Sequence, residues 1–140
     1  MKTNKQERFQ QQIEREIDKA TSKFNEHLLS NSKWVRLINA LVENSELLKS
    51  IKFKKVQGEA IGDLFIYEDT TFGFDYWENG FEGHNSLGGW LTFKEIEYLF
   101  FPLKLDNETQ DLNKIKTVIN SVGEFCLSEN SKGLKLICYR

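Results

Sequence analysis

The feature that most constrains this chain is a change in the spacing of its apolar residues near residue 50. Before that point apolar residues recur every three or four positions, and from Ile51 onward they recur roughly every second position. The first spacing places side chains on one face of a helix, and the second alternates them between the two faces of a strand. The sequence therefore predicts helices followed by a sheet, which is an α+β fold.

Residues 4–29 carry a narrow apolar stripe. Its members recur at helical spacing among Gln, Glu, Lys, Arg and Asn: Phe9, Ile13, Ile17, Ala20, Phe24 and Leu28. A stripe this thin is typical of a helix that lies on the outside of a domain or pairs with another helix. We predict a peripheral amphipathic helix over 4–29, with a dimer contact or a membrane surface as alternatives. The mixed charges of its polar face weigh against the membrane.

A second, broader helix is predicted from residue 33 to about residue 48, because Ser30–Ser32 offers N-cap chemistry and Trp34 opens an apolar face. Strands are predicted at 51–57, 60–68, 72–77 and 91–102, the last with a turn near Lys94–Glu95 and its end at Pro102.

A third helix follows DNETQ at 106–110, and a hairpin closes the chain. The predicted order is ααββββαββ in a single domain, 1–140, in which the helix 4–29 lies against a core formed by 31–140. One antiparallel sheet carries helices on one face.

Cys126 and Cys138 lie within the apolar patterns FCL and LICY, so we expect two buried thiols. Histidines at ligand spacing do not accompany them, which makes a zinc site improbable. The start MKTNKQERFQQQ has no apolar leader, and no apolar run approaches the ~18 residues of a membrane span. We expect a cytoplasmic protein that needs no metal or cofactor.

Charge is distributed unevenly along the chain. Residues 59–97 hold nine acidic and one basic side chain, whereas residues 1–58 hold seven acidic and twelve basic ones. A sheet covered on one side exposes alternate residues on the other, so Asp63, Asp75 and Trp77 are expected to project from an open acidic face. Such a face repels phosphate and attracts cationic proteins, which argues against nucleic-acid binding by the sheet. The alternative is that these acids only aid solubility and keep strand edges unpaired.

The stretch DYWENGFEGHNSLGGW at Asp75–Trp90 concentrates aromatic rings, carboxylates and glycines. Interface cores favour Trp and Tyr, so Trp77 and Phe81 are predicted anchors for a protein partner. A small enzyme centred on Glu82 and His84, or a site for a hard cation, are weaker alternatives. The predicted protein-binding residues are Asp63, Asp75, Trp77, Glu78, Phe81, Glu82, His84 and Glu97.

The order of several motifs resembles a family of small bacterial proteins of the immunity type, the antidotes encoded beside polymorphic or contact-dependent toxins. The likeness is carried by the pattern KW-xx-L-xx-AL from Lys33 to Leu41, by FKEIEYLFFP at Phe93–Pro102, and by a closing strand that ends in Tyr139. It covers about residues 31–140, with Tyr98 where the family pattern has tryptophan.

The resemblance implies a non-enzymatic protein that binds and neutralises a cationic toxin, a nuclease in many such pairs. In that role Asp75, Glu78, Glu82 and Glu97 pair with basic residues of the toxin cleft, while Trp77 and Phe81 anchor the contact. The sequence leaves open whether the protein is a monomer or a dimer. A homo-oligomeric scaffold that uses the helix 4–29 is the alternative function.

Overall fold

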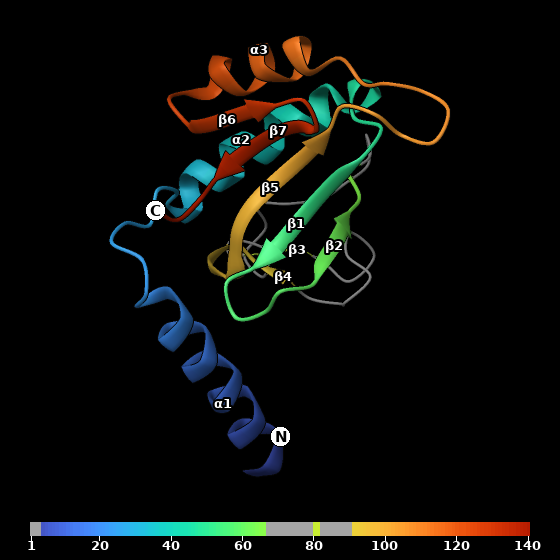
Figure 1. Cartoon of the computed structure of the whole chain (residues 1–140). Helices are drawn as coiled ribbons and strands as arrows, with labels where there is room; N and C mark the ends of the chain where they lie inside the picture. Colours follow the sequence, from blue (N-terminus) through green and yellow to red (C-terminus); the bar gives the residue numbers. More distant parts are fainter. Residues whose placement is uncertain (1–3, 67–79, 82–90) are drawn as a thin grey trace.

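The computed structural model describes residues 4–66, 80–81 and 91–140. It is an α+β fold in which a five-stranded antiparallel sheet carries helices on one face, as predicted. Figure 1 shows α2 running behind the sheet, α3 above β6 and β7, and α1 projecting from the lower end of the molecule.

The helices, including two short 3-10 turns (η), are α1 (Asn4–Thr21), α2 (Asn31–Glu43), η1 (Ser45–Leu47), η3 (Phe93–Glu95) and α3 (Leu112–Val122). The strands are β1 (Ile51–Lys55), β2 (Ile61–Leu64), β3 (Gly80–Phe81), β4 (Leu91–Thr92), β5 (Ile96–Pro102), β6 (Cys126–Asn130) and β7 (Gly133–Ile137). The order differs from the prediction in that β3 was not predicted and the segment 91–102 contains two strands, β4 and β5, separated by η3 near the expected turn. The predicted strand 72–77 lies outside the described residues.

The large sheet has the strand order β2-β1-β5-β7-β6, so β5 is its central strand. β3 and β4 form a separate two-stranded ladder in which Phe81 pairs with Leu91. All pairs of the large sheet are antiparallel, and a bulge shifts the β1–β5 register between Lys54 and Lys55. A bulge bends a strand and changes where its side chains point.

The inner face of the sheet meets α2 and α3 in one continuous core. Apolar residues of α2 and α3 join those of the central strands: Trp34, Leu37, Ile38, Leu41, Ile115, Ile119, Phe53, Leu99, Phe101, Leu134 and Leu136. Ser30 caps α2 by accepting a hydrogen bond from the Lys33 amide, as its sequence position predicted. Asp111 caps α3 in the same way through the Lys114 amide.

The predicted helix 4–29 is too long, because α1 ends at Thr21. Beyond it the backbone pairs with the residues that follow β7: the amides of Asn25 and Glu26 donate to the carbonyl of Arg140, and the Leu28 amide donates to the carbonyl of Cys138. These tertiary hydrogen bonds replace the helical ones that the spacing of Phe24 and Leu28 had suggested. Both side chains still pack against the core, but from an extended segment.

Candidate functional site

The outer face of the sheet is the surface on which sequence reasoning placed part of its site. Strand register puts five side chains of one row side by side, in the order Asp63, Lys52, Phe100, Lys135 and Ser128. The neighbouring row contains Ile61, Lys54, Tyr98, Ile137 and Cys126. Because α2 and α3 lie on the inner face, no described helix covers these rows (Figure 1).

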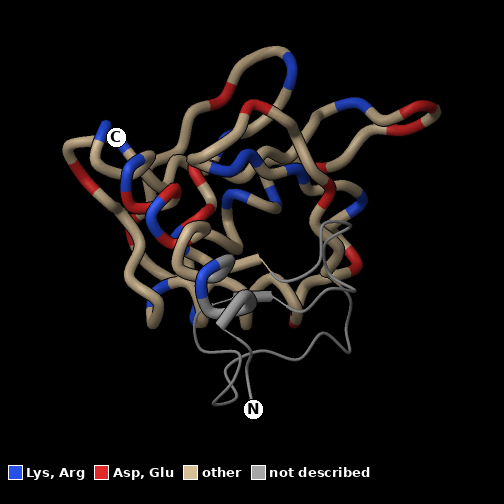
Figure 2. The backbone as a smooth tube through the Cα atoms, turned by 90° about the horizontal axis from the view of Figure 1, so that it is seen from below, with Lys and Arg blue, Asp and Glu red and all other residues tan. Residues whose placement is uncertain are grey.

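The prediction that this face is acidic is wrong for the residues that the structure describes. The Lys52 ammonium lies 2.5 Å from a carboxylate oxygen of Asp63, and the Lys54 ammonium lies 2.8 Å from one of Glu97. Both carboxylates are therefore neutralised by lysines of β1, the adjacent strand. Figure 2 shows basic and acidic positions interspersed along the described backbone.

The two ion pairs differ in their exposure to solvent. The side chains of Lys54 and Glu97 are only 13% and 23% exposed, whereas those of Lys52 and Asp63 are 39% and 40% exposed. Water screens the more exposed pair, Lys52 and Asp63, so this pair is weak and can exchange partners. The less exposed pair, Lys54 and Glu97, is held more firmly. Glu97 therefore holds Lys54 in place within the sheet.

Two aromatic residues occupy the centre of the outer face. Tyr98 and Phe100 are half-buried and lie two residues apart on β5. The Lys135 ammonium lies 4.3 Å from the centroid of the Tyr98 ring, which is a cation–π contact. The Phe100 ring lies over Gly133, where an added Cβ would come within 2.7 Å of it.

Glu95 is a carboxylate that sequence reasoning counted in the acidic segment, and it is buried. One of its oxygens accepts 2.8 Å hydrogen bonds from the amide and the hydroxyl of Thr92, which forms a capping box at η3. Its other oxygen accepts a 2.8 Å bond from Gln57 and lies 3.8 Å from Lys55. Glu95 is thus a structural group with its bonding capacity used.

Most of the remaining predicted site residues fall outside the part of the chain that the structure describes. Asp75, Trp77, Glu78, Glu82 and His84 lie outside the described residues. Phe81 belongs to β3, and its backbone pairs with Leu91. Of the predicted site residues that the structure describes, Asp63 and Glu97 lie on the sheet face.

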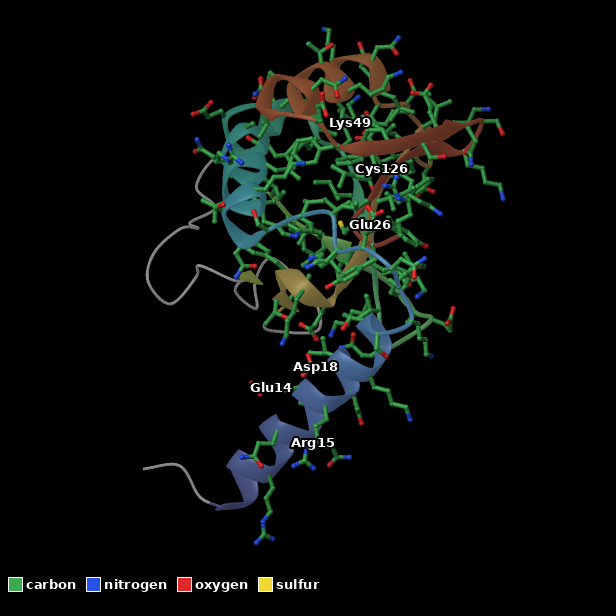
Figure 3. The ribbon with its side chains drawn as sticks, turned by 90° about the vertical axis from the view of Figure 1, so that its left-hand side faces the viewer. Glu14, Arg15, Asp18, Glu26, Lys49 and Cys126 are labelled. Carbon is green, nitrogen blue, oxygen red and sulfur yellow. The ribbon has the colours of Figure 1, made fainter. Side chains whose placement is uncertain are left out.

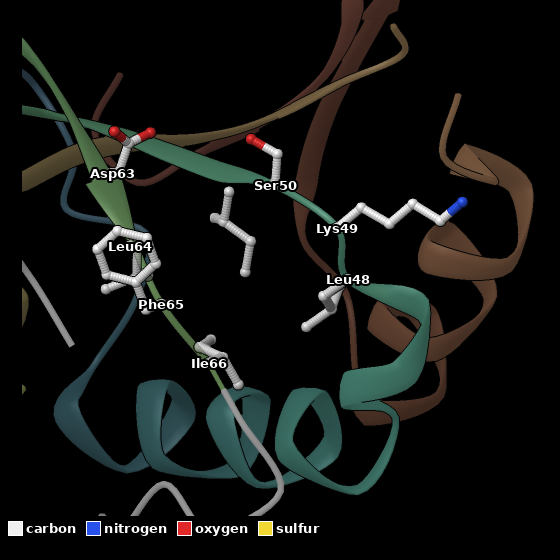
Figure 4. A pocket seen from close by; sticks show the side chains of 8 residues that line it. Leu48, Lys49, Ser50, Asp63, Leu64, Phe65 and Ile66 are labelled. Carbon is white, nitrogen blue, oxygen red and sulfur yellow. The ribbon is translucent and has the colours of Figure 1, made fainter. Parts of the chain in front are cut away.

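A cavity of about 180 Å³ lies between the ends of β1 and β2 (Figure 4). Its walls are part apolar and part polar, with Leu48, Leu64 and Ile66 among the apolar residues. Its two charged members, Lys49 and Asp63, are bound to Glu108 and Lys52. This cavity thus offers a ligand little polar chemistry that is not already engaged.

The expectation of two buried thiols is half correct. Cys138 is buried, whereas Cys126 is half-buried on the outer row of β6. Among the described residues no group of three or more His, Cys, Asp or Glu side chains is arranged to hold a metal ion. In the same part of the chain, no helix is long and apolar enough to cross a membrane.

No protein-family model, no curated protein and no solved structure matches this chain.

Sequence reasoning missed the outer-face residues Lys52, Tyr98, Phe100 and Lys135. The alternation of KFKK predicts that Lys52 and Lys54 share one face of their strand, and that of EYLF predicts the same for Tyr98 and Phe100. What the sequence did not contain was the register that places them in the same two rows.

Proposed function

We propose that this protein is a binding protein of the immunity type, whose partner is a cationic protein such as a nuclease toxin. The observation that carries the proposal is the composition of residues 67–90, which contain five carboxylates and no lysine or arginine. An acidic, aromatic-rich segment favours a basic partner through charge complementarity and offers large side chains as anchors.

The segment 67–90 is flanked by buried elements at both ends, which supports a role in display. Leu64 and Ile66 precede it in the core, and Leu91 and Phe93 follow it there. A chain segment whose two ends are held in a core loses less conformational entropy when it binds than a free tail does.

Each of the three lysines of β1 lies beside a carboxylate of the described residues. Lys52, Lys54 and Lys55 contact Asp63, Glu97 and Glu95 respectively. Lys94, the basic residue nearest in sequence to the segment, lies 3.6 Å from Asp18 of α1. These contacts favour a partner, rather than the lysines of β1 or Lys94, as the source of positive charge for the acidic segment 67–90.

The test is to look for a toxin gene beside the gene for this chain and, where one is present, to titrate its toxin domain with this protein by calorimetry. We expect Asp75→Lys with Glu78→Lys to weaken binding at least 30-fold, since the loss of a desolvated charge pair costs ~2–5 kcal/mol. The matched control is Glu43→Lys with Glu46→Lys, which reverses two exposed carboxylates at the end of α2 and in η1.

Both double variants are expected to melt at nearly the wild-type temperature, and the control is expected to bind like wild type. Equal affinity of Asp75→Lys/Glu78→Lys and wild type would refute the segment as the contact. Equal weakening by both double variants would show that only net charge matters.

A further inference from the structure

The outer sheet face has a composition that suits a second kind of ligand. Three lysines, Lys52, Lys54 and Lys135, share it with two carboxylates, Asp63 and Glu97. The acidic face that argued against nucleic acid is therefore absent from the described sheet. Instead, lysines lie on both sides of the rings at the centre of the sheet.

We propose that this face binds single-stranded nucleic acid, with bases stacked on Tyr98 and Phe100 and phosphates held by Lys52 and Lys135. Register puts Lys52 and Lys135 on either side of Phe100 in one row. Tyr98 and Phe100 are two residues apart, about 6.6 Å along the strand, so successive bases of an extended strand can each reach one ring. Aromatic platforms flanked by cations are how sheets bind single strands without reading their sequence.

The contacts seen in the free protein can be exchanged for those of the ligand. Lys135 lies over Tyr98 and has no carboxylate within ion-pair distance among the described residues. A cation–π contact that is open to solvent on one side is worth about 0.5–2 kcal/mol, and the stacking of a base on a ring about 1–3 kcal/mol, so a base can displace the ammonium group toward a phosphate.

Lys52 can change partners at little cost, because its pair with Asp63 is about 40% exposed on both sides. The less exposed pair of Lys54 and Glu97 stays intact and holds these two side chains of β1 and β5 in place. The ligand therefore meets two available cations, one on each side of the rings.

The net charge of −2 argues that stacking, rather than long-range attraction, carries the affinity. Release of counterions from two phosphates predicts a slope of about −1.4 in a plot of log K against log salt. This slope is shallow for a nucleic-acid-binding protein and separates the proposal from nonspecific polyanion binding.

The experiment is fluorescence anisotropy with labelled dT12 and with an abasic 12-mer that has the same phosphates and no bases. Wild type is expected to bind dT12 at least tenfold more tightly than the abasic strand. Tyr98→Ala and Phe100→Ala are each expected to weaken dT12 binding about tenfold. Lys135→Glu is expected to weaken it to a similar or smaller extent.

A matched control lies on the other side of the sheet. Lys33 lies 4.4 Å from the centroid of the Phe125 ring, the same kind of contact as that of Lys135 and Tyr98. Phe125→Ala and Lys33→Glu are expected to leave dT12 binding unchanged. If Phe100→Ala fails to fold, quenching of 2-aminopurine in a dT strand by wild type, and its loss in Lys135→Glu, decides the question.

Three results would overturn the proposal: no binding of dT12 at 100 µM protein, equal binding of the abasic strand, or equal effects of the control variants. Binding of poly-glutamate without binding of dT12 would assign the face to an acidic protein partner. The test is independent of the proposed function, because it uses different residues and a ligand of opposite charge.

Discussion

The indole of Trp34 stacks on the ring of Phe93, with 5.2 Å between their centroids and 9° between their planes. Trp34 lies in the first turn of α2, and Phe93 is the first residue of η3, shortly after the segment 67–90. Both side chains are fully buried. The contact therefore holds the N-terminal end of α2 against η3.

We predict that Trp34→Ala costs about 3–5 kcal/mol of unfolding free energy, because it leaves a large cavity beneath Phe93. Trp34→Phe is the control and is expected to cost less, since the buried indole N–H has no hydrogen-bond partner among the described residues. Urea unfolding followed by circular dichroism measures both. Similar losses of unfolding free energy in the two variants would mean that the volume of the Trp34 side chain is not what stabilises the fold.

The two ion pairs of β1 are predicted to differ in their energetic coupling. A double-mutant cycle on Lys54 and Glu97 is expected to give a coupling of about 1–2 kcal/mol, between the values for exposed and buried pairs. The same cycle on Lys52 and Asp63 should give less than about 1 kcal/mol, and 1 M salt should reduce it further. Equal couplings would contradict the difference in exposure.

The two thiols are predicted to react at different rates. Cys126 is half-buried and is expected to react with a thiol reagent in the native protein, whereas Cys138 is buried. Burial, reinforced by the nearby carboxylate of Glu97, raises the pKa of Cys138 well above its ordinary value and keeps it protonated. Mass spectrometry after labelling at pH 8 should find one adduct in native protein and two in urea. Rapid double labelling without urea would contradict the burial of Cys138.

Alkaline pH is predicted to destabilise the fold through Tyr139. Burial raises the pKa of its phenol from 10.0 to about 12, with Cys138 and Asp18 adding to the effect. Because the unfolded phenol ionises first, its stabilising effect is complete below about pH 10 and is lost as the pH rises toward 12. The buried thiol of Cys138 adds a loss of the same sign from about pH 9.

Urea unfolding of wild type and of Tyr139→Phe from pH 7 to 11 measures this dependence. The variant also loses the 2.6 Å hydrogen bond from Tyr139 to the carbonyl of Lys94, so it should be less stable by about 1 kcal/mol at pH 7. Its stability should then fall less steeply above pH 10. Parallel curves for the two proteins would exclude Tyr139 as a source of the dependence.

The helix α1 is predicted to detach without unfolding the rest of the chain. Ile17 is 3% exposed, yet it lies outside the continuous core of the sheet, and Figure 3 shows α1 extending away from the body. An isolated helix of 18 residues is marginal in water. Ile17→Ser should therefore increase the rate of hydrogen exchange at the backbone amides of α1. The control Ile13→Ser, at a half-buried position, should have a smaller effect. Loss of protection in α2 as well would show that α1 and the core unfold together.

Local patterns predicted much of this fold because their causes are local. The helical spacing around Trp34 and Leu37, and the hairpin around 129–133, depend on neighbouring residues alone, and the structure contains both. The end of α1 could not be predicted in this way. The helical turns predicted after Thr21 are replaced by an extended segment, because Glu26 forms backbone hydrogen bonds with Arg140, which is distant in the sequence.

The candidate site was predicted less well for the same reason. A count of charges identified an acidic segment correctly, but it treated Asp63 and Glu97 as free. Which lysine faces which carboxylate depends on the register between β1 and its neighbours, and a shift of one residue would send every side chain to the other face.

The sequence by itself determined which residues are apolar at helical or alternating spacing, and hence that helices cover one face of a sheet. Only the tertiary structure decided that Lys52 and Lys54 meet Asp63 and Glu97, and that Tyr98 lies under Lys135. The physical reason is that spacing along a chain sets the direction of each side chain. Pairing between strands then decides, over long sequence distances, which charges cancel and which rings share a surface.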